Sequence, residues 1–278
     1  MSDAQLDLCF KRHPDHGTYL DRRVFRWPFT LSRGFRLDRV PAGKLTLILQ
    51  TVSGAIQADD SLLQRIRVCN GAAAFVTTQG ATAVYRAPVG ICATDTVELE
   101  VEDGGVIEYL PEPRILFPQS CLAQRLLLRV ALSGVAMLSE AFLLHDPAGQ
   151  GRAFRRYSSE LVIERPGGDV VLRERIELDV MPQRGGRRAP YGAHGMLLVV
   201  APRPPAELEA LCSGMAAGVG SGIETYAAAS TLPREIGVGL RVVAIDGQHL
   251  RRALRAACCA AREHLFGGDP GSGRKTAV

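Results

Sequence analysis

Two carboxylates stand out in this sequence as side chains that could do chemistry. Glu140 lies in the middle of an otherwise apolar run, and a carboxylate buried there would need a partner or a water-filled channel. Asp60 follows a turn, and as a hard oxygen ligand it could hold a hydrated cation weakly. The competing interpretation of Asp60 is turn chemistry, because aspartate commonly bonds its own backbone before a strand. We therefore take Asp60 and Glu140 as candidates for a polar channel or cation path.

Nitrogen and sulfur side chains give weaker signals for metal binding. His13 and His16 lie close together in the sequence, and imidazole suits a borderline divalent ion such as nickel. A terminal segment of this composition is more often mobile than metal-bound, so we expect residues 1–20 to be mobile. Cys258 and Cys259 are adjacent in an expected helix, where neighbouring side chains point about 100° apart. They are therefore expected to be small core residues.

No catalytic signature survives a check of its context. Residues 218–222 read Gly-x-Gly-x-Gly, but they follow an expected helix, whereas a dinucleotide loop links a strand to a helix. Residues 271–276 resemble a phosphate loop only superficially, because the spacing is wrong and no helix follows. The sequence has no Gly-x-Ser-x-Gly elbow. We expect a protein that is not an enzyme.

Composition places the chain among cytoplasmic globular proteins. Its 278 residues, 46% of them hydrophobic, can bury a core in one large domain. The formal charge of +4 is too small and too dispersed to indicate a nucleic-acid partner. The N-terminus lacks the pattern of a secretory signal, and no apolar run reaches the roughly 20 residues needed to span a bilayer. The seven cysteines form no Cys-x-x-Cys pair, which favours reduced thiols over a disulfide framework.

Many short strands are expected between residues 44 and 180. The clearest one alternates Val97, Leu99 and Val101 with glutamates, so one face is buried and the other is wet. Asp-Gly at 103–104 follows it and predicts a hairpin with a second strand at 106–110. The expected strands are 45–52, 62–69, 73–78, 82–86, 96–102, 106–110, 126–132, 135–144, 159–165, 169–180 and, further on, 237–245.

Strands at this spacing without intervening helices indicate an all-β sandwich, barrel or solenoid. No fixed repeat length is visible in the letters, so the pattern leaves these three open. Consecutive apolar residues at 126–128 and 197–200 require strands covered on both faces, and hence at least two stacked β layers. We expect a single, mainly β domain over residues 21–267 and a disordered tail at 268–278.

Two helices are expected in the C-terminal half of this domain, near 205–217 and 248–266. Each carries one apolar stripe at helical spacing. The second helix holds Arg251, Arg252 and Arg255 away from that stripe. The bland interpretation of these arginines is the solvated face of a packing helix, and the alternative is a surface that docks a partner.

One block of the sequence, residues 77–86, resembles the urease accessory protein UreD family, also called UreH. Landmarks of that family also stand upstream, from residue 43 to residue 60, and downstream, from residue 109 to residue 115. About half of the chain carries them, in the right order and at compatible spacing. A wet strand face is the competing interpretation of the block's polar members. These are Thr77, Thr78, Gln79, Tyr85 and Arg86.

The resemblance implies a two-layered β-helical body with a short helical portion. It also implies a non-catalytic scaffold that helps to insert nickel into apo-urease. Members of the family bind urease and the UreF protein, and through UreF they recruit the GTPase UreG. Nickel would pass transiently, no cofactor would be tightly bound, and neither nucleic acid nor membrane would be a partner. On this basis the two helices, and Arg251, Arg252 and Arg255 in particular, are candidate docking surfaces for UreF.

Several positions depart from the family pattern, among them a glycine pair that is reduced here to Ala58-Asp59. Lysine is usual where this chain has Ala83, and Gly-Glu is common where it has Arg156 and Tyr157. The missing glutamate removes a plausible inward carboxylate, which leaves open a diverged UreD copy with impaired nickel transfer. The rival from another class is a stand-alone β-sandwich module that binds a ligand such as carbohydrate. Such a module would offer stacking aromatics, and this chain has one Trp and six Tyr.

Overall fold

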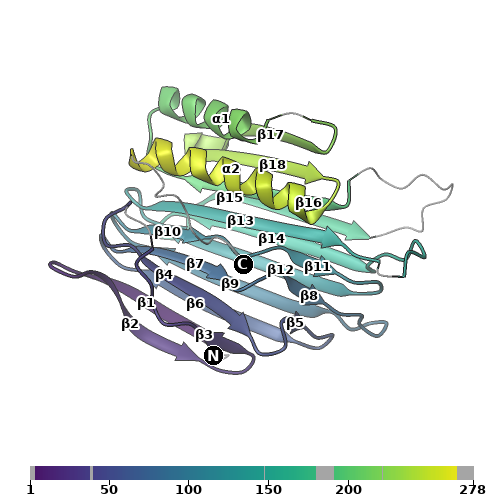
Figure 1. The fold of residues 1–278 in the computed structure, drawn as a ribbon. Coiled ribbons are helices and arrows are strands. Elements are labelled where there is room, and N and C mark those ends of the chain that lie inside the picture. Colours follow the sequence, from purple (N-terminus) through teal and green to yellow (C-terminus); the bar gives the residue numbers. More distant parts are fainter. Residues whose placement is uncertain (1–3, 38–39, 147, 180–190, 221, 268–278) are drawn as a thin grey trace.

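The computed structural model of the chain consists of two stacked β-sheets, with two helices packed against the end of one of them (Figure 1). The structure describes residues 4–37, 40–146, 148–179, 191–220 and 222–267. The predicted mainly β fold with layered sheets and two helices in the C-terminal half is confirmed. Neither helix within the described ranges is long and apolar enough to cross a membrane. The tail predicted to be disordered, 268–278, lies outside the described residues.

The smaller sheet has seven strands in the order β15-β14-β12-β9-β6-β1-β2. Its strands are β1 (Leu6–His13), β2 (Gly17–Phe25), β6 (Ser61–Val68), β9 (Ala93–Val101), β12 (Cys121–Val130), β14 (Arg156–Glu164) and β15 (Val170–Asp179). The larger, eleven-stranded sheet follows the path β17-β18-β16-β13-β10-β7-β4-β3, with the short strands β5, β8 and β11 beside it. Its strands are β3 (Phe29–Leu31), β4 (Leu45–Thr51), β5 (Ala55–Ile56), β7 (Ala73–Thr78), β8 (Thr82–Val84), β10 (Val106–Tyr109), β11 (Arg114–Leu116), β13 (Val135–Leu144), β16 (Ala193–Val200), β17 (Thr225–Thr231) and β18 (Gly237–Ala244).

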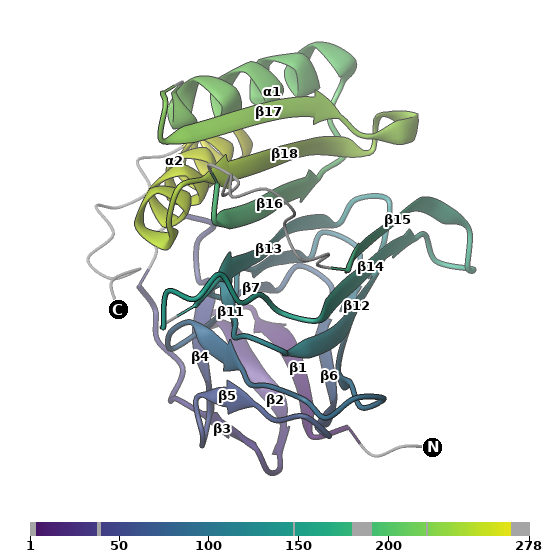
Figure 2. The ribbon, with the colours of Figure 1, turned by 90° about the vertical axis from the view of Figure 1, so that its right-hand side faces the viewer.

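The chain alternates between the two sheets and so winds into a solenoid. In the seven-stranded sheet β6, β9 and β12 run parallel to one another. The strands that follow them in the chain, β7, β10 and β13, run parallel in the eleven-stranded sheet. Figure 2 shows the two sheets facing each other, with the strands of successive coils stacked side by side. Of the three architectures that the sequence left open, the molecule adopts the solenoid.

The hairpin predicted at Asp103-Gly104 was wrong. β9 lies in the seven-stranded sheet, whereas β10 lies in the other sheet between β7 and β13. Gly104 has a φ of +63° and turns a corner of the solenoid, stacked on Gly71 in the neighbouring coil. Asp-Gly signals a backbone that needs positive φ, and it does not distinguish a hairpin from a solenoid corner. The predicted alternation was right, since Val97, Leu99 and Val101 are buried between the sheets.

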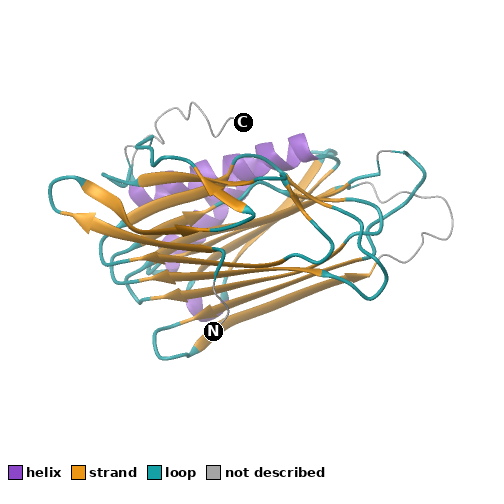
Figure 3. Cartoon of the chain, turned by 90° about the horizontal axis from the view of Figure 1, so that it is seen from below, coloured by secondary structure: helices purple, strands orange, loops and turns teal. Residues whose placement is uncertain are grey.

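Two apolar cores hold the fold together. The larger one fills the space between the sheets, and the smaller one lies between the eleven-stranded sheet and the helices α1 (Pro205–Val219) and α2 (Gly247–Phe266). Figure 3 shows both helices together on one side of the strands. Asp246 caps α2, because its carboxylate accepts the backbone N–H of His249 at 2.9 Å. Gly195 of β16 allows α2 to approach closely: a Cβ there would lie 2.9 Å from a methyl of Leu250. Both helices are therefore found where the sequence placed them.

Residues 1–20 were predicted to be mobile, and for the described residues 4–20 this was wrong. β1 and β2 form an antiparallel hairpin, and β1 also pairs in parallel with β6. Leu6, Leu8 and Phe10 are buried in the larger core. Their alternation with polar residues is the period-two signal of a strand, which the many charges of this segment obscured.

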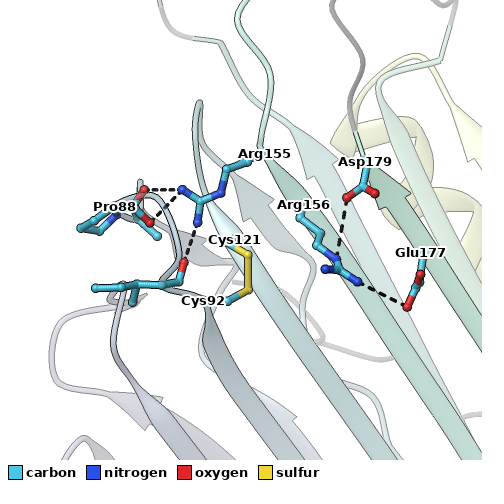
Figure 4. Close-up of a disulfide and its surroundings, with 9 residues drawn as sticks. Pro88, Cys92, Cys121, Arg155, Arg156, Glu177 and Asp179 are labelled. Carbon is cyan, nitrogen blue, oxygen red and sulfur yellow. Dashed lines mark hydrogen bonds and ion pairs between the residues drawn. A yellow bond between two sulfur atoms is a disulfide. The ribbon is translucent and has the colours of Figure 1, made fainter.

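Reduced thiols were expected throughout, but Cys92 and Cys121 form a disulfide (Figure 4). Cys121 begins β12, and Cys92 stands directly before the neighbouring strand β9. Beside the disulfide, the guanidinium of Arg155 donates to the carbonyl oxygens of Ala87 and Pro88, at 2.8 and 2.9 Å. Disulfide and arginine together fasten the loop before β9 to the next coils. The two cysteines are 29 positions apart in the sequence, so only the register of the coils reveals their proximity.

Candidate functional site

A row of polar side chains interrupts the apolar interior between the two sheets. Asp95 of β9, Gln124 of β12 and Ser159 of β14 are direct partners in the parallel register, so they form a ladder across three coils. Gln64 of β6 extends this ladder by a hydrogen bond to Asp95. The eleven-stranded sheet adds one basic and one acidic residue, which contact the ladder from the opposite side. We call this row the polar seam; it consists of Gln64, Asp95, Arg114, Gln124, Glu140 and Ser159.

Asp95 is the most enclosed charge of the polar seam, with a side chain that is 3% exposed. Its Oδ1 accepts a hydrogen bond from the Gln64 amide at 2.9 Å, and its Oδ2 forms an ion pair with the guanidinium of Arg114. A buried carboxylate persists only when its charge is balanced and its oxygens are hydrogen-bonded, and here both conditions are met. The phenol of Tyr109 lies nearby, and its burial raises the pKa of Tyr109.

Glu140 binds across the two sheets. Its Oε1 accepts a hydrogen bond from the Tyr157 hydroxyl at 2.5 Å, and its Oε2 accepts one from the Ser159 hydroxyl at 2.8 Å. Burial raises the pKa of Tyr157 well above its usual range, and the neighbouring carboxylate raises it further. The phenol is therefore a proton donor that holds the carboxylate in place. The prediction that Glu140 points inward agrees with this position.

Three hollows lie at or near the polar seam, and two of them have its side chains as walls. The smallest has a volume of about 40 Å³ and is lined by Asp95, Arg114 and Glu140 among others. That is room for water, since a single molecule needs roughly 10–15 Å³ of such volume. A second hollow of about 300 Å³ shares Tyr109 and Arg114 with the first and reaches exposed Gln79. A third, of about 100 Å³, lies beside α2 and shares Pro111, Glu112 and Ser139 with the first.

The other predicted channel residue, Asp60, lies outside this row. Its Oδ2 accepts the backbone N–H of Gln57 at 2.7 Å, and its own N–H donates to the carbonyl of Gln57. Its carbonyl accepts the N–H of Thr94. These are the contacts of a turn that starts a strand, which is the competing interpretation offered for this residue.

The N-terminal histidines meet at the tip of the β1–β2 hairpin. The rings of His13 and His16 stack with centroids 4.6 Å apart, and the Nδ1 atom of His13 accepts the N–H of Asp15 at 3.2 Å. Over the described part of the chain, no group of three or more His, Cys, Asp and Glu side chains is arranged to hold a metal ion. A metal bound here would have to rely on two imidazoles and solvent.

The family block divides into an inner and an outer part. The hydroxyl of Thr77 donates to the carbonyl of Leu110 at 2.7 Å, and that of Thr78 accepts the N–H of Glu112 at 2.9 Å. These two bonds tie β7 to the segment that separates the hollows. The remaining three members lie at the surface: Gln79, Tyr85 and Arg86. Three residues that depart from the family pattern are also placed. Ala83 lies in β8, and Tyr157 is buried. Arg156 pairs with Glu177 and Asp179 (Figure 4).

The three arginines proposed for docking lie on the exposed side of α2. Arg251, which lines the hollow beside α2, forms an ion pair with Glu112 at 3.0 Å. Arg255 lines the same hollow, and Arg252 is exposed. This face of α2 is therefore at the surface, next to a recess whose inner wall belongs to the solenoid.

A buried charge cluster that the sequence did not reveal fixes α2 to the solenoid. Glu108 of β10 accepts the Lys44 ammonium at 2.5 Å, and its other oxygen accepts Nε of Arg262 at 2.8 Å. The side chains of Lys44 and Glu108 are at most 1% exposed. Both cations also lie over the ring of Phe75. Nothing in the local pattern marks these residues, because the three charged partners are far apart in the sequence.

The polar seam, by contrast, leaves a trace in the sequence. In β6, β9, β12 and β14 of the seven-stranded sheet, the apolar stripe contains one polar residue where an apolar one would continue the alternation. Gln64 precedes Ile66 and Val68, and Asp95 precedes Val97 and Leu99. An inward polar residue in the first half of several successive strands is the signal that would have predicted the ladder.

Comparison with known proteins gives a consistent match. The family model of the UreD urease accessory protein matches residues 2–276 of the chain. The chain is 41% identical over 262 residues to urease accessory protein UreD 2 of Bradyrhizobium sp. strain BTAi1, covering 93% of this chain and 89% of the relative. It is 33% identical to UreD 1 of Methylorubrum extorquens strain PA1, covering 98% and 92% of the two chains. It is 30% identical to UreD 1 of Pseudomonas syringae pv. tomato strain DC3000, covering 98% and 95%.

Proposed function

The chain belongs to the UreD family of urease accessory proteins, and on that premise we propose that it is a non-catalytic scaffold for inserting nickel into apo-urease. Its proposed partners are apo-urease and UreF, with the GTPase UreG reached through UreF. Nickel is cargo in this proposal, passing through the protein without a tightly bound state. A stiff two-layered solenoid with exposed helices suits a scaffold, because it presents fixed surfaces on several sides.

The polar seam is the observation that carries the proposal. A hydrated divalent cation moves through a protein only where oxygen ligands and water replace its lost hydration. Asp95 and Glu140 supply carboxylates between the sheets, and the cavity that they share has room for water. The two neighbouring hollows share lining residues with this cavity, and one lies beside α2 while the other reaches Gln79. We propose that nickel follows this row, through Glu140 and Asp95 and not through Asp60.

The contact of Tyr157 favours a chain that still transfers nickel along the polar seam over a diverged copy that has lost this transfer. The family commonly has a glutamate at this position, and the tyrosine removes that charge. The tyrosine hydroxyl donates to Glu140, however, so the interior keeps one carboxylate at this place. The proposal is that Glu140, oriented by Tyr157 and Ser159, takes the role of the missing glutamate.

For UreF we propose docking at the α2 face, where Arg251, Arg252 and Arg255 border the hollow beside the helix. The position of this hollow supports docking here. A partner that delivers nickel must sit at one mouth of the row, and this hollow shares walls with the cavity that Asp95 and Glu140 line. Charged residues at the rim of an interface mainly set its specificity and association rate.

A pull-down tests the proposal. The immobilised chain is exposed to apo-urease, to UreF, and to both, and retention is read by quantitative blotting. We expect both partners to be retained, and we expect Arg252→Glu to weaken UreF retention at least tenfold. Arg173→Glu, which changes an equally exposed arginine on β15, serves as the matched control and should retain UreF fully. Failure to retain either apo-urease or UreF would contradict the scaffold role, and equal retention by both variants would contradict the α2 site.

A further inference from the structure

The first coil of the solenoid leaves an open edge at the end of the molecule opposite the helices (Figure 1). β2 is the last strand of the seven-stranded sheet, and β3 is the last strand of the eleven-stranded sheet. The helices pack at the other end of the larger sheet, over β16 and β18. An edge strand presents backbone N–H and C=O groups that can pair with another chain. We call β2 together with residues 26–37 the open edge.

The net charge of the chain is concentrated at the open edge, although it was predicted to be dispersed. Residues 21–37 contain five arginines and one aspartate, which gives this segment a formal charge of +4. The whole chain also has a formal charge of +4, so its other residues balance to zero. A partner that fits this edge therefore carries negative charge. The arginines are Arg22, Arg23, Arg26, Arg33 and Arg36.

Strands that carry arginine elsewhere in the seven-stranded sheet lie beside strands that carry glutamate. Arg65 of β6 pairs with Glu98 of β9 at 2.8 Å, and β12 pairs with β14 in the same way. β2 has only β1 beside it, which supplies Asp7 to Arg22. Arg23 of β2 has no carboxylate partner in the described part of the chain, and its guanidinium lies over an aromatic ring instead. An acidic strand on the free side of β2 would continue the charge pattern of the sheet.

A hollow of about 300 Å³ lies between the two sheets at the open edge. Its walls come from β2, from β4 and from the segment that follows β3. Leu20, Leu45 and Leu47 make part of this lining apolar. Arg23 and Arg36 make another part of it basic. The hollow can therefore take apolar side chains from a strand added to β2, with acidic side chains nearby.

Arginines on an edge strand commonly keep other chains away, and this is the competing interpretation of the open edge. Three exposed aromatic side chains at this edge do not fit that role: Tyr19, Phe25 and Trp27. Arginine, tyrosine and tryptophan are the residue types that contribute most at protein interfaces. A second copy of this chain is a poor occupant, since joining two such edges would place arginine against arginine.

We propose that the open edge binds an extended segment of a partner protein in which acidic and apolar side chains alternate. The segment adds as a strand to β2, with its apolar side chains toward the hollow and its acidic ones toward the arginines. β9 has this pattern within the chain itself: Val97, Leu99 and Val101 face inward, and its glutamates pair with the arginines of β6. The site is distinct from α2 and from the polar seam, and its occupancy is independent of nickel transfer.

The test is binding of a fluorescein-labelled peptide to the full-length chain, measured by fluorescence anisotropy. The peptide copies residues 96–102, Thr-Val-Glu-Leu-Glu-Val-Glu, which belong to the acidic strand β9. We expect saturable binding that weakens as salt is added. Arg23→Glu/Arg33→Glu, which changes two exposed arginines of the open edge, should bind at least tenfold more weakly. Trp27 is the only tryptophan and is 70% exposed, so unlabelled peptide should shift its emission to shorter wavelength.

Backbone methylation separates strand addition from charge attraction alone. An added strand pairs with β2 through the N–H groups of alternate residues only. Two further peptides carry N-methyl groups on one or on the other set of alternate residues. We expect one of them to lose at least tenfold in affinity and the other to bind as the unmodified peptide does. Equal binding by both would overturn strand addition and with it the proposal.

Arg173→Glu changes an exposed arginine on β15, at the other edge of the same sheet, and is the matched control that should bind the peptide fully. Circular dichroism of each variant should match that of the wild type, and the milder Arg23→Gln/Arg33→Gln should weaken binding in the same direction. Absence of saturable binding, wild-type affinity in the double variants, or equal binding of a peptide with lysine in place of glutamate would overturn the proposal. So would tighter binding of single-stranded DNA, or a dimer of the free chain in sedimentation that Arg23→Glu/Arg33→Glu abolishes.

Discussion

The polar seam and the contact between α2 and the solenoid both bury charged side chains, but they do so differently. In the seam, Asp95 and Glu140 border a cavity and accept hydrogen bonds from neighbouring coils, and Asp95 is also ion-paired with Arg114. Under α2, Lys44 and Glu108 line none of the three hollows, although their partner Arg262 lines the one beside α2, and their charges are balanced within one compact cluster. The first arrangement leaves oxygens beside space for water, whereas the second fills its space with partners.

This difference indicates two uses of buried charge in one fold. A carboxylate beside a cavity can exchange its partner for a passing cation at small structural cost. A carboxylate enclosed between two cations cannot, because removing either partner leaves a buried charge without compensation. We therefore propose transfer for the polar seam and a latch for the Lys44–Glu108–Arg262 cluster.

The largest effect is expected from breaking the latch. Glu108→Gln leaves Lys44 and Arg262 without their shared carboxylate, and losing one partner of a buried ion pair costs about 3–5 kcal/mol. Urea unfolding followed by circular dichroism measures the change. Glu100→Gln, which removes a carboxylate from an exposed pair with Arg67, should cost less than about 1 kcal/mol. Equal losses in both variants would contradict the latch.

A smaller loss is expected inside the polar seam. Tyr157→Phe removes the hydroxyl that donates to Glu140, and an unsatisfied buried acceptor costs about 1–3 kcal/mol. The bordering cavity should soften this cost, since water can take the place of the hydroxyl. Tyr85→Phe is the control, because Tyr85 is exposed and should lose nothing measurable. A loss as large as that of Glu108→Gln would erase the distinction between seam and latch.

The smallest effect is expected where β7 is bonded to the segment that separates the hollows. Thr77→Val removes the hydrogen bond from β7 to the carbonyl of Leu110, worth about 0.5–1.5 kcal/mol. Thr231→Val, at an exposed position on β17, is the comparison and should be neutral. The free energy of unfolding of both variants is measured in urea. A neutral Thr77→Val would show that this bond does not stabilise the wall between the hollows.

Whether a feature of the fold could be predicted from the sequence depends on how far apart in the chain its interacting residues lie. The alternation of Val97, Leu99 and Val101 is local, so β9 and its buried face were predictable. Strand pairing is not local. The Asp-Gly corner predicted a hairpin because the local sequence does not show that β9 and β10 pair with strands of other coils. The family resemblance, and not the periodicity, supplied the β-helical body.

The candidate site shows the same limit. Glu140 was predicted because a single charge in an apolar run is conspicuous. Asp95 and Gln64 were missed, although each sits where its strand should be apolar. Arg114 could not have been paired with Asp95 in advance, since that contact depends on two sheets facing each other. The Lys44–Glu108–Arg262 cluster depends on α2 folding back over β10, which no local pattern encodes.

Nickel delivery through the polar seam is the central claim, and metal analysis of matured urease tests it most directly. Apo-urease is activated at limiting nickel with UreF, UreG and one form of this chain, and nickel per urease active site is then measured. The double variant Asp95→Asn/Arg114→Gln keeps shape and net charge, and a second variant carries Glu140→Gln. We predict that both lower the nickel content at least severalfold while still binding UreF and apo-urease, and that Asp60→Asn leaves it unchanged. Wild-type nickel content with both seam variants would contradict the account.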